Sequence, residues 1–208
     1  MQPETAEPLR VVWISDGAGD AARIRRIGLA VLRGGVRTIL LREPRLERAA
    51  CARLVEDLRP ALDAVGGLLL VHTRTAGGAA IAGADGRHAP AGTTLPARGL
   101  AQVRGMSVHD AAEIQAAAAQ DLDYVLLGAV FATRSHPGQV PLGVARARML
   151  ARTAAVAVLA VGGIDAALAP QLRVPEIAGI ACIRALADAA DPEAAARELV
   201  AAYRGGGR

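Results

Sequence analysis

The residues with the clearest chemical potential follow an apolar segment at positions 124–131. This segment, YVLLGAVF, has the composition of a buried strand and leads into a short polar loop. In that loop Thr133 and Ser135 supply hydroxyls, Arg134 a cation and His136 an imidazole. Groups of these types together are suited to bind an anion. We therefore expect Thr133 and Ser135 to contact an anionic ligand, with local capping of their own loop as the alternative.

A second anion site is indicated by the sequence VGGID at positions 161–165. Gly162 and Gly163 let the backbone approach a ligand closely, just ahead of a predicted helix that starts near Asp165. Arg184 follows the next apolar segment and is expected to reach the same anion. We predict that Gly162, Gly163 and Arg184 bind a phosphate group. The alternative is that the two glycines only form a tight turn.

The four histidines are the candidates for acid–base chemistry, because imidazole titrates near neutral pH. His72 and His136 both follow predicted strands, and we expect these two to be catalytic. His109 precedes an amphipathic segment and is expected to have a structural role at a helix start. His88 suits a structural role and a ligand contact equally.

Two arginines also stand at predicted strand ends. Arg42 is expected to bind substrate, and the equally weighted alternative is an internal ion pair with the adjacent Glu43. Arg74 is expected to be structural.

Composition limits the chemistry and the partners of the chain. All 24 basic residues are arginine, so no side chain can form a Schiff base, and a phosphate must be held by arginine, hydroxyl or backbone N–H groups. The net charge of +4 is scattered, without a basic block interleaved with aromatic residues, which argues against nucleic-acid binding. The two cysteines are too few for a disulfide framework or a zinc site. With no signal peptide or long apolar run in the sequence, we expect a cytoplasmic protein without a membrane segment.

The elements that position these residues alternate along the whole chain. Eight apolar segments, each followed by a helix-like segment, predict parallel strands that are buried on both faces. Residues 76–84, 96–105 and 165–173 are among the helix-like segments. Eight such units predict a single (β/α)₈ barrel over residues 1–208, with residues 1–8 as an extension and 204–208 as a flexible tail. The alternative is an open doubly wound sheet. In a barrel, the carboxyl ends of the strands bring the polar residues named above to one face.

Eight motifs, in this order, carry a family resemblance: TILLREP, LLLVHTR, AGADGRH, GMSVHDAAE, DYVLLGAVFAT, PLG, LAVGGID and DPEAAARELV. In this order the motifs resemble thiamine phosphate synthases and the related thiazole tautomerases. The resemblance spans about Val11 to Ala201. It implies a (β/α)₈ barrel, often dimeric, which acts on phosphorylated thiazole compounds.

The chain departs from the synthases at several positions that the resemblance assigns to function. Of the family's Gln-x-Arg-x-Lys motif, Arg42 is retained, but Leu40 and Pro44 stand at the glutamine and lysine positions. The acid of an Asn-Asp-Arg motif that contributes to Mg²⁺ binding is replaced by Thr73, and the segment HAPAGTTLP lacks the second metal carboxylate. His136 stands at a further lysine position.

The tautomerases also differ from this chain, because Ala129 stands where they have a catalytic histidine, while Arg184 replaces a phosphate-binding serine of the family. A tautomerase nevertheless needs only one base and an anchored phosphate. We therefore expect a metal-independent, tautomerase-like enzyme without a cofactor. One alternative is a diverged thiamine phosphate synthase that joins a pyrimidine diphosphate to a thiazole phosphate and uses Mg²⁺, with Glu43 or Asp16 as replacement ligands. The other is an inactive phosphate-binding or regulatory protein. The expected partners are a small phosphorylated substrate and a second copy of the chain.

Overall fold

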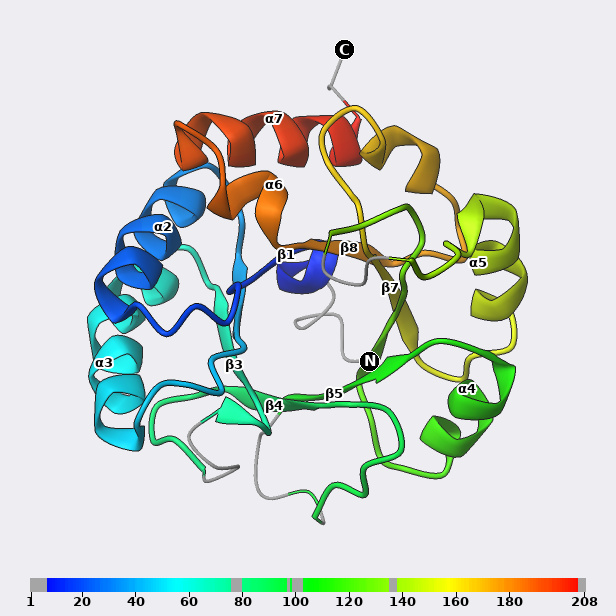
Figure 1. Ribbon diagram of the computed structural model, residues 1–208, viewed down its shortest axis with the longest axis horizontal. Helices are drawn as coiled ribbons and strands as arrows, with labels where there is room; N and C mark the ends of the chain where they lie inside the picture. The colour runs from blue at the N-terminus through cyan, green and yellow to red at the C-terminus, as the bar shows by residue number, and fades with distance from the viewer. Residues whose placement is uncertain (1–6, 76–79, 97, 99–102, 135–137, 206–208) are drawn as a thin grey trace.

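The structure, a computed structural model, forms a closed barrel of eight parallel strands in sequence order (Figure 1). It describes residues 7–75, 80–96, 98, 103–134 and 138–205. The strands are β1 (Val11–Ile14), β2 (Thr38–Leu41), β3 (Leu68–His72), β4 (Gly86–Ala89), β5 (Val103–Val108), β6 (Tyr124–Gly128), β7 (Ala157–Val161) and β8 (Gly179–Cys182). Since β8 pairs with β1, no strand edge is left open, and the predicted (β/α)₈ architecture is confirmed.

Helices surround most of the barrel. They are α2 (Ala21–Arg33), α3 (Arg48–Ala64), α4 (Ala111–Ala118), α5 (Gly143–Ala151), the short α6 (Arg184–Ala187) and α7 (Pro192–Arg204). Two 3₁₀ turns, η1 (Pro8–Arg10) and η3 (Ala169–Leu172), complete the described elements. Between β3 and β4 and between β4 and β5, the described part of the chain forms loops instead of α-helices (Figure 1).

Three predicted helices differ from the structure. The segment 76–84 is expected to be helical, but its described residues 80–84 contain no helix, and Gly83, with a φ of 80°, explains why a helix is disfavoured there. Half of the helix expected at 96–105 lies outside the described residues, and its described residues 103–105 belong to β5. The helix expected at 165–173 is reduced to the turn η3, which contains Pro170.

The long helices begin and end where local chemistry favours it. The side chain of Asp20 accepts a hydrogen bond from the Arg23 N–H at the start of α2, and Asp191 does the same for Glu193 and Ala194 at the start of α7. Pro192 occupies the first turn of α7, where a missing N–H has no cost. The apolar face of α2 is buried, and α2 lies between α3 and α7. These caps and packed faces hold the helices against the strands.

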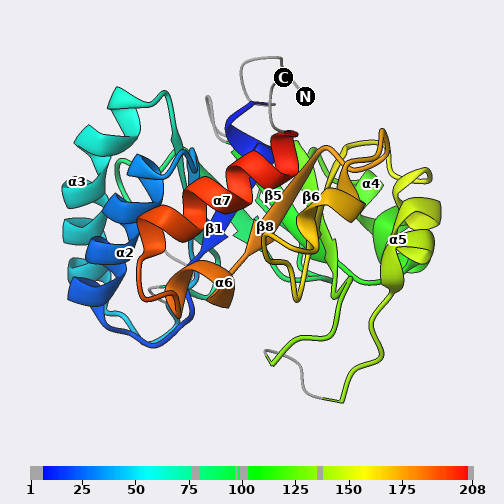
Figure 2. The same ribbon diagram turned by 90° about the horizontal axis from the view of Figure 1, so that it is seen from above.

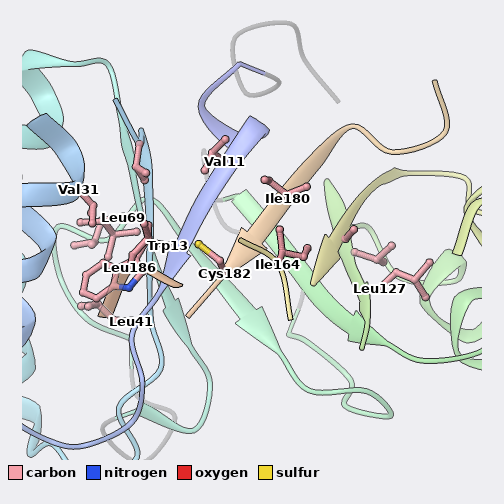
Figure 3. Close-up of a cluster of buried hydrophobic side chains, with 14 of the residues drawn as sticks. Val11, Trp13, Val31, Leu41, Leu69, Leu127, Ile164, Ile180, Cys182 and Leu186 are labelled. Atoms are coloured by element: carbon pink, nitrogen blue, oxygen red, sulfur yellow. The ribbon is translucent and has the colours of Figure 1, made fainter. Parts of the chain in front are cut away.

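The hydrophobic core has two parts, one on each side of the strands. The outer part lies between strands and helices and includes Trp13, Leu41 and Leu69, which meet Val31 of α2 (Figure 3). The inner part fills the barrel and is formed by ten buried residues: Leu9, Val12, Ile14, Leu40, Leu70, Val103, Tyr124, Leu126, Leu159 and Ala181. The barrel is therefore a packed core rather than a pore.

Tyr124 fits inside the barrel because a glycine stands opposite it. Gly105 of β5 pairs with Tyr124 of β6. A Cβ atom at Gly105 would lie 2.1 Å from the tyrosine ring, well inside van der Waals contact. Only glycine therefore leaves room for this ring. The hydroxyl of Tyr124 in turn contacts His88.

The two ends of the barrel differ in character. Leu9 of η1 packs into the amino-terminal end, and the Thr38 hydroxyl donates to the Pro8 carbonyl at 2.7 Å. The loop that follows β6 extends from the opposite end (Figure 2). Residues 1–6 and 206–208 lie outside the described residues, while Pro8 and Arg204 belong to η1 and α7. Within the described chain, none of the helices has the length and apolar character needed to cross a bilayer.

The contact between Gly105 and Tyr124 predicts a large effect of a single methyl group. We expect Gly105→Ala to lower the free energy of unfolding by about 3 kcal/mol or more, because the ring has no space to move into. Gly66 is a matched control, since its φ of 59° is left-handed but nothing lies within 4 Å of an added Cβ. Gly66→Ala should cost about 1 kcal/mol, from backbone strain alone. Urea unfolding measures both, and equal losses would contradict the packing argument.

Candidate functional site

The carboxyl ends of the strands surround a cavity of about 880 Å³. Its floor is the top layer of the barrel interior, including Ile14, Leu40 and Leu126. Its walls are the polar residues at the strand ends and the loop after β6. An apolar floor with polar walls at this end of the barrel is typical of a small-molecule site.

Most residues that the sequence predicted for the site line this cavity. Arg42, His72, Thr133, Gly162, Gly163 and Arg184 all do so, from five different strand ends. Ser135 and His136 lie outside the described residues, so the predictions for them stay predictions. The structure therefore brings together every described member of the predicted set.

His72 is held in one tautomer at the end of β3. Its Nδ1 accepts the backbone N–H of Arg74 at 3.0 Å, so the ring proton is on Nε2. Burial, together with the Arg42 and Arg74 guanidiniums, lowers the pKa of His72 to about 4. The ring is thus neutral at pH 7 and presents an N–H donor rather than a free basic nitrogen. This disagrees with the predicted role of His72 as a general base.

His88 belongs to a buried chain of hydrogen bonds beneath the cavity. The Tyr124 hydroxyl lies 3.0 Å from Nδ1 of His88, and Nε2 lies 2.9 Å from the Ser107 hydroxyl. Burial and the nearby His72 and Arg42 hold the pKa of His88 well below its usual range, so the ring is neutral.

The direction of this chain of hydrogen bonds follows from the tyrosine. Tyr124 has a single O–H proton, and among the described residues His88 Nδ1 is its only hydrogen-bond partner. Nδ1 is then the acceptor, so Nε2–H donates to Ser107. The proton of the Ser107 hydroxyl is left for an acceptor in the cavity, which Ser107 lines. The rule that barrel sites lie at strand ends places Ser107 near the site. Its role as a donor could not be predicted, because its partners depend on the register of β4, β5 and β6.

The paired glycines are required by the chain itself. Gly162 has φ 101° and Gly163 has φ 66°. A Cβ at Gly162 would lie 2.6 Å from that of Ala129, and one at Gly163 would lie 2.4 Å from the Ala132 carbonyl oxygen. The Phe131 N–H also donates to the Gly162 carbonyl at 3.0 Å. The glycines therefore let the loop after β6 pack on the end of β7, which supports the turn interpretation; a contact with phosphate stays a prediction.

Arg184 lies on the cavity wall beside these glycines. Its Nη1 is buried and has no hydrogen-bond partner among the described residues. A buried guanidinium nitrogen without a partner is costly, and an oxyanion in the cavity would satisfy it.

Arg42 and Glu43 do not pair with each other. Both oxygens of the fully buried Glu43 accept backbone N–H groups, from Gly17 at 3.1 Å and from Gly19 at 2.9 Å. Glu43 therefore fixes the loop after β1, and the alternative of an ion pair between Arg42 and Glu43 is wrong. The Arg42 guanidinium lines the cavity and makes no hydrogen bond or ion pair with any described residue. The same is true of the exposed Arg74 side chain, so the structural role expected of Arg74 is not supported.

Other charged residues at the rim have structural partners. Arg23 of α2 contacts Asp16 and donates to the Ala187 carbonyl at 2.9 Å. Arg134 pairs with Asp188 at 3.0 Å. His109 donates to Glu113 at the start of α4, which confirms its predicted role at a helix start.

The donor set does not fit a divalent metal ion. Mg²⁺ prefers oxygen ligands, normally including one or two carboxylates. Of the described residues on the cavity wall, only Asp16 and Asp165 carry a carboxylate. Asp16 is held by Arg23, and Asp165 accepts the N–H groups of Ala167 and Leu168. No group of three or more acidic, histidine or cysteine side chains suited to a metal occurs in the described chain.

Comparisons with known proteins place the chain in a family. Residues 11–186 match the family described as thiamine monophosphate synthase. A thiamine-phosphate synthase from Roseiflexus castenholzii is 37% identical over 84% of this chain and 80% of the relative, and one from Laribacter hongkongensis is 31% identical over 85% of each. A solved thiamine phosphate pyrophosphorylase from Pyrococcus furiosus has a TM-score of 0.76 at 22% identity, over 96% of this chain and 97% of that one, which supports the fold.

The low pKa of His72 predicts a loss of stability in acid. The unfolded ring titrates near pH 6.5 and the folded ring near pH 4. Between these values the unfolded chain binds more protons, so the free energy of unfolding falls as the pH drops through this window. We expect His72 to account for about 2 kcal/mol of the loss between pH 7 and pH 5.

Urea unfolding of the wild type and His72→Gln at both pH values measures this contribution. Glutamine keeps an acceptor for the Arg74 N–H but does not titrate, and His88 is common to both proteins. The variant should lose about 2 kcal/mol less stability than the wild type on acidification. An identical loss in both proteins would contradict a neutral, buried His72.

Proposed function

Since this chain belongs to the thiamine monophosphate synthase family, we propose that it joins a pyrimidine diphosphate to a thiazole phosphate and releases diphosphate. The observation that carries this proposal is the charge of the cavity. Arg42, Arg74 and Arg184 line it, and their guanidiniums have no hydrogen bond or ion pair with any described residue. Three unneutralised cations in one cavity favour a substrate set with more than one phosphate group.

The positions of the arginines suit two separate anions. Arg184 lies beside Gly162 and Gly163 at the ends of β7 and β8, where barrels commonly bind a phosphate. Arg42 and Arg74 follow the neighbouring strands β2 and β3. We assign the thiazole phosphate to the first group and the diphosphate to the second.

This arrangement suits a substitution with a diphosphate leaving group. When the bond between the pyrimidine's carbon and the diphosphate breaks, the diphosphate leaves with the electron pair and gains negative charge. Guanidiniums positioned beforehand stabilise that charge more strongly in the reacting state than in the bound substrate. The thiazole nitrogen forms the new bond to carbon, so no general base is required of His72. The neutral His72 Nε2–H and the Ser107 hydroxyl are both available as donors to the substrates.

The tautomerase-like activity expected from the sequence is less well supported. Its two candidate bases were His72, whose Nδ1 is occupied and whose pKa is about 4, and His136, which lies outside the described residues. Ala129 stands on the cavity wall at the position that the resemblance gives to the tautomerase histidine. The relatives that were compared are also named as synthases.

Product formation tests the proposed function. The chain is incubated with the pyrimidine diphosphate and the thiazole phosphate, in parallel reactions with Mg²⁺ and with EDTA, and thiamine phosphate is measured by its fluorescence after oxidation. We expect product in at least one condition. Absence of product in both would contradict the synthase proposal, and exchange of solvent deuterium into the thiazole phosphate would then indicate a tautomerase.

The proposed phosphate site gives a sharper expectation for one variant. Arg184→Gln should raise KM for the thiazole phosphate about tenfold or more, because a charge-assisted hydrogen bond to phosphate is lost. Its KM for the pyrimidine diphosphate should change much less. Arg53→Gln, at an exposed position of α3, removes the same charge away from the cavity and is the matched control. Equal effects of the two variants would contradict the assigned role of Arg184.

A further inference from the structure

The cavity combines free cations with carboxylates that are already occupied. Asp16 is bound by Arg23 and the Ala18 N–H, and Asp165 by two N–H groups of its own turn. Glu43, directly after Arg42 in the chain, uses both oxygens to hold the loop after β1. Recruiting any of these acids to a metal ion would leave buried or capping N–H groups without an acceptor, which carries a free-energy cost. The acids therefore do not form a latent metal site.

Unlike these acids, the arginine guanidiniums at the ends of β2 and β3 have no partner in the described chain. Arg42 and Arg74 follow adjacent strands, and neither guanidinium contacts an acceptor among the described residues. Both guanidiniums act electrostatically on His72. The Nδ1 of His72 accepts the backbone N–H of Arg74, and its Nε2–H has no partner in the described chain. Two guanidiniums, that of the half-buried Arg42 and that of the exposed Arg74, and one N–H donor thus line the wall at β2 and β3. None of the three is bound by an acceptor of the described chain, so a ligand in the cavity can take them up.

Guanidinium groups can do directly what a metal ion does for a diphosphate. Arginine keeps its charge at every physiological pH and offers a planar pair of N–H donors that match two phosphate oxygens. A metal ion supplies charge to the same oxygens but needs carboxylates to hold it. The first arrangement fits the residues of this wall and the second does not.

We propose that this chain binds the diphosphate of its substrate directly through Arg42 and Arg74, with His72 Nε2–H as a further donor and without a divalent metal ion. The identity of the substrate rests on the proposed function. The mode of diphosphate binding is a separate statement about the residues of this chain.

Binding of inorganic pyrophosphate tests the proposal without relying on turnover. Isothermal titration calorimetry is carried out in EDTA and again with excess Mg²⁺. We expect pyrophosphate to bind in EDTA, and Mg²⁺ to leave the affinity unchanged or to weaken it by occupying the free ligand. Binding that requires Mg²⁺, or that Mg²⁺ strengthens tenfold or more, would overturn the proposal, as would no binding in either condition.

Variants separate specific binding from general charge attraction. Arg42→Gln and Arg74→Gln should each weaken pyrophosphate binding in EDTA about tenfold or more. Arg53→Gln removes the same charge from the exposed surface of α3 and should have little effect. Circular dichroism and thermal unfolding of each variant confirm that it is folded. An equal effect of Arg53→Gln and the two cavity variants would overturn the assignment.

Turnover distinguishes failure of this inference from failure of the proposed function. Thiamine phosphate formed in EDTA supports both. Thiamine phosphate formed only with Mg²⁺ overturns the direct binding mode and leaves the synthase activity standing. Arginine-dependent binding of pyrophosphate in EDTA, without product in any condition, supports the binding mode and contradicts the synthase activity.

Discussion

The structure depends on filling a narrow barrel of eight short parallel strands. Closure leaves no free edge, but it also forces side chains from every strand into one small interior. Gly105 gives the space that Tyr124 occupies, and Tyr124 supports His88 from below. His88 in turn orients Ser107 at the floor of the cavity. The same packing that stabilises the barrel therefore sets the direction of a hydrogen-bond donor in the candidate site.

Above this floor, electrostatics determines what the site can bind. The carboxylates near the mouth are used to hold loops and helix ends, while three arginines keep their donors free for a ligand. A chain without lysine has only arginine as a permanent cation, so any charge that the family draws from lysine must come from guanidiniums or be lost. Arg42 and Arg74 retain that charge at adjacent strand ends, and burial of the His72 ring together with these two charges keeps His72 neutral.

Much of the fold and part of the site could be predicted from the sequence. Continuous apolar segments identify the parallel strands, and the rule that barrel sites lie at strand ends places Arg42, His72 and Arg184 on one cavity. Helices were predicted less well, because alanine-rich segments such as residues 80–84 favour helix by composition while glycine opposes it. Gly17 and Gly19, the partners of Glu43, lie 26 and 24 positions away in the loop after β1. His88 joins Tyr124 and Ser107, which lie 36 and 19 positions from it in other strands. No local pattern in the sequence specifies the packing and register that bring these residues together.

The central claim, that guanidiniums bind the diphosphate directly, is tested most directly by a crystal structure of the protein with pyrophosphate, grown in EDTA. We predict that the phosphate oxygens lie within hydrogen-bond distance of the Arg42 and Arg74 guanidiniums, with no metal ion between protein and ligand. Pyrophosphate bound elsewhere, or found in the cavity only when Mg²⁺ is supplied and bridged to the protein by that ion, would contradict the account.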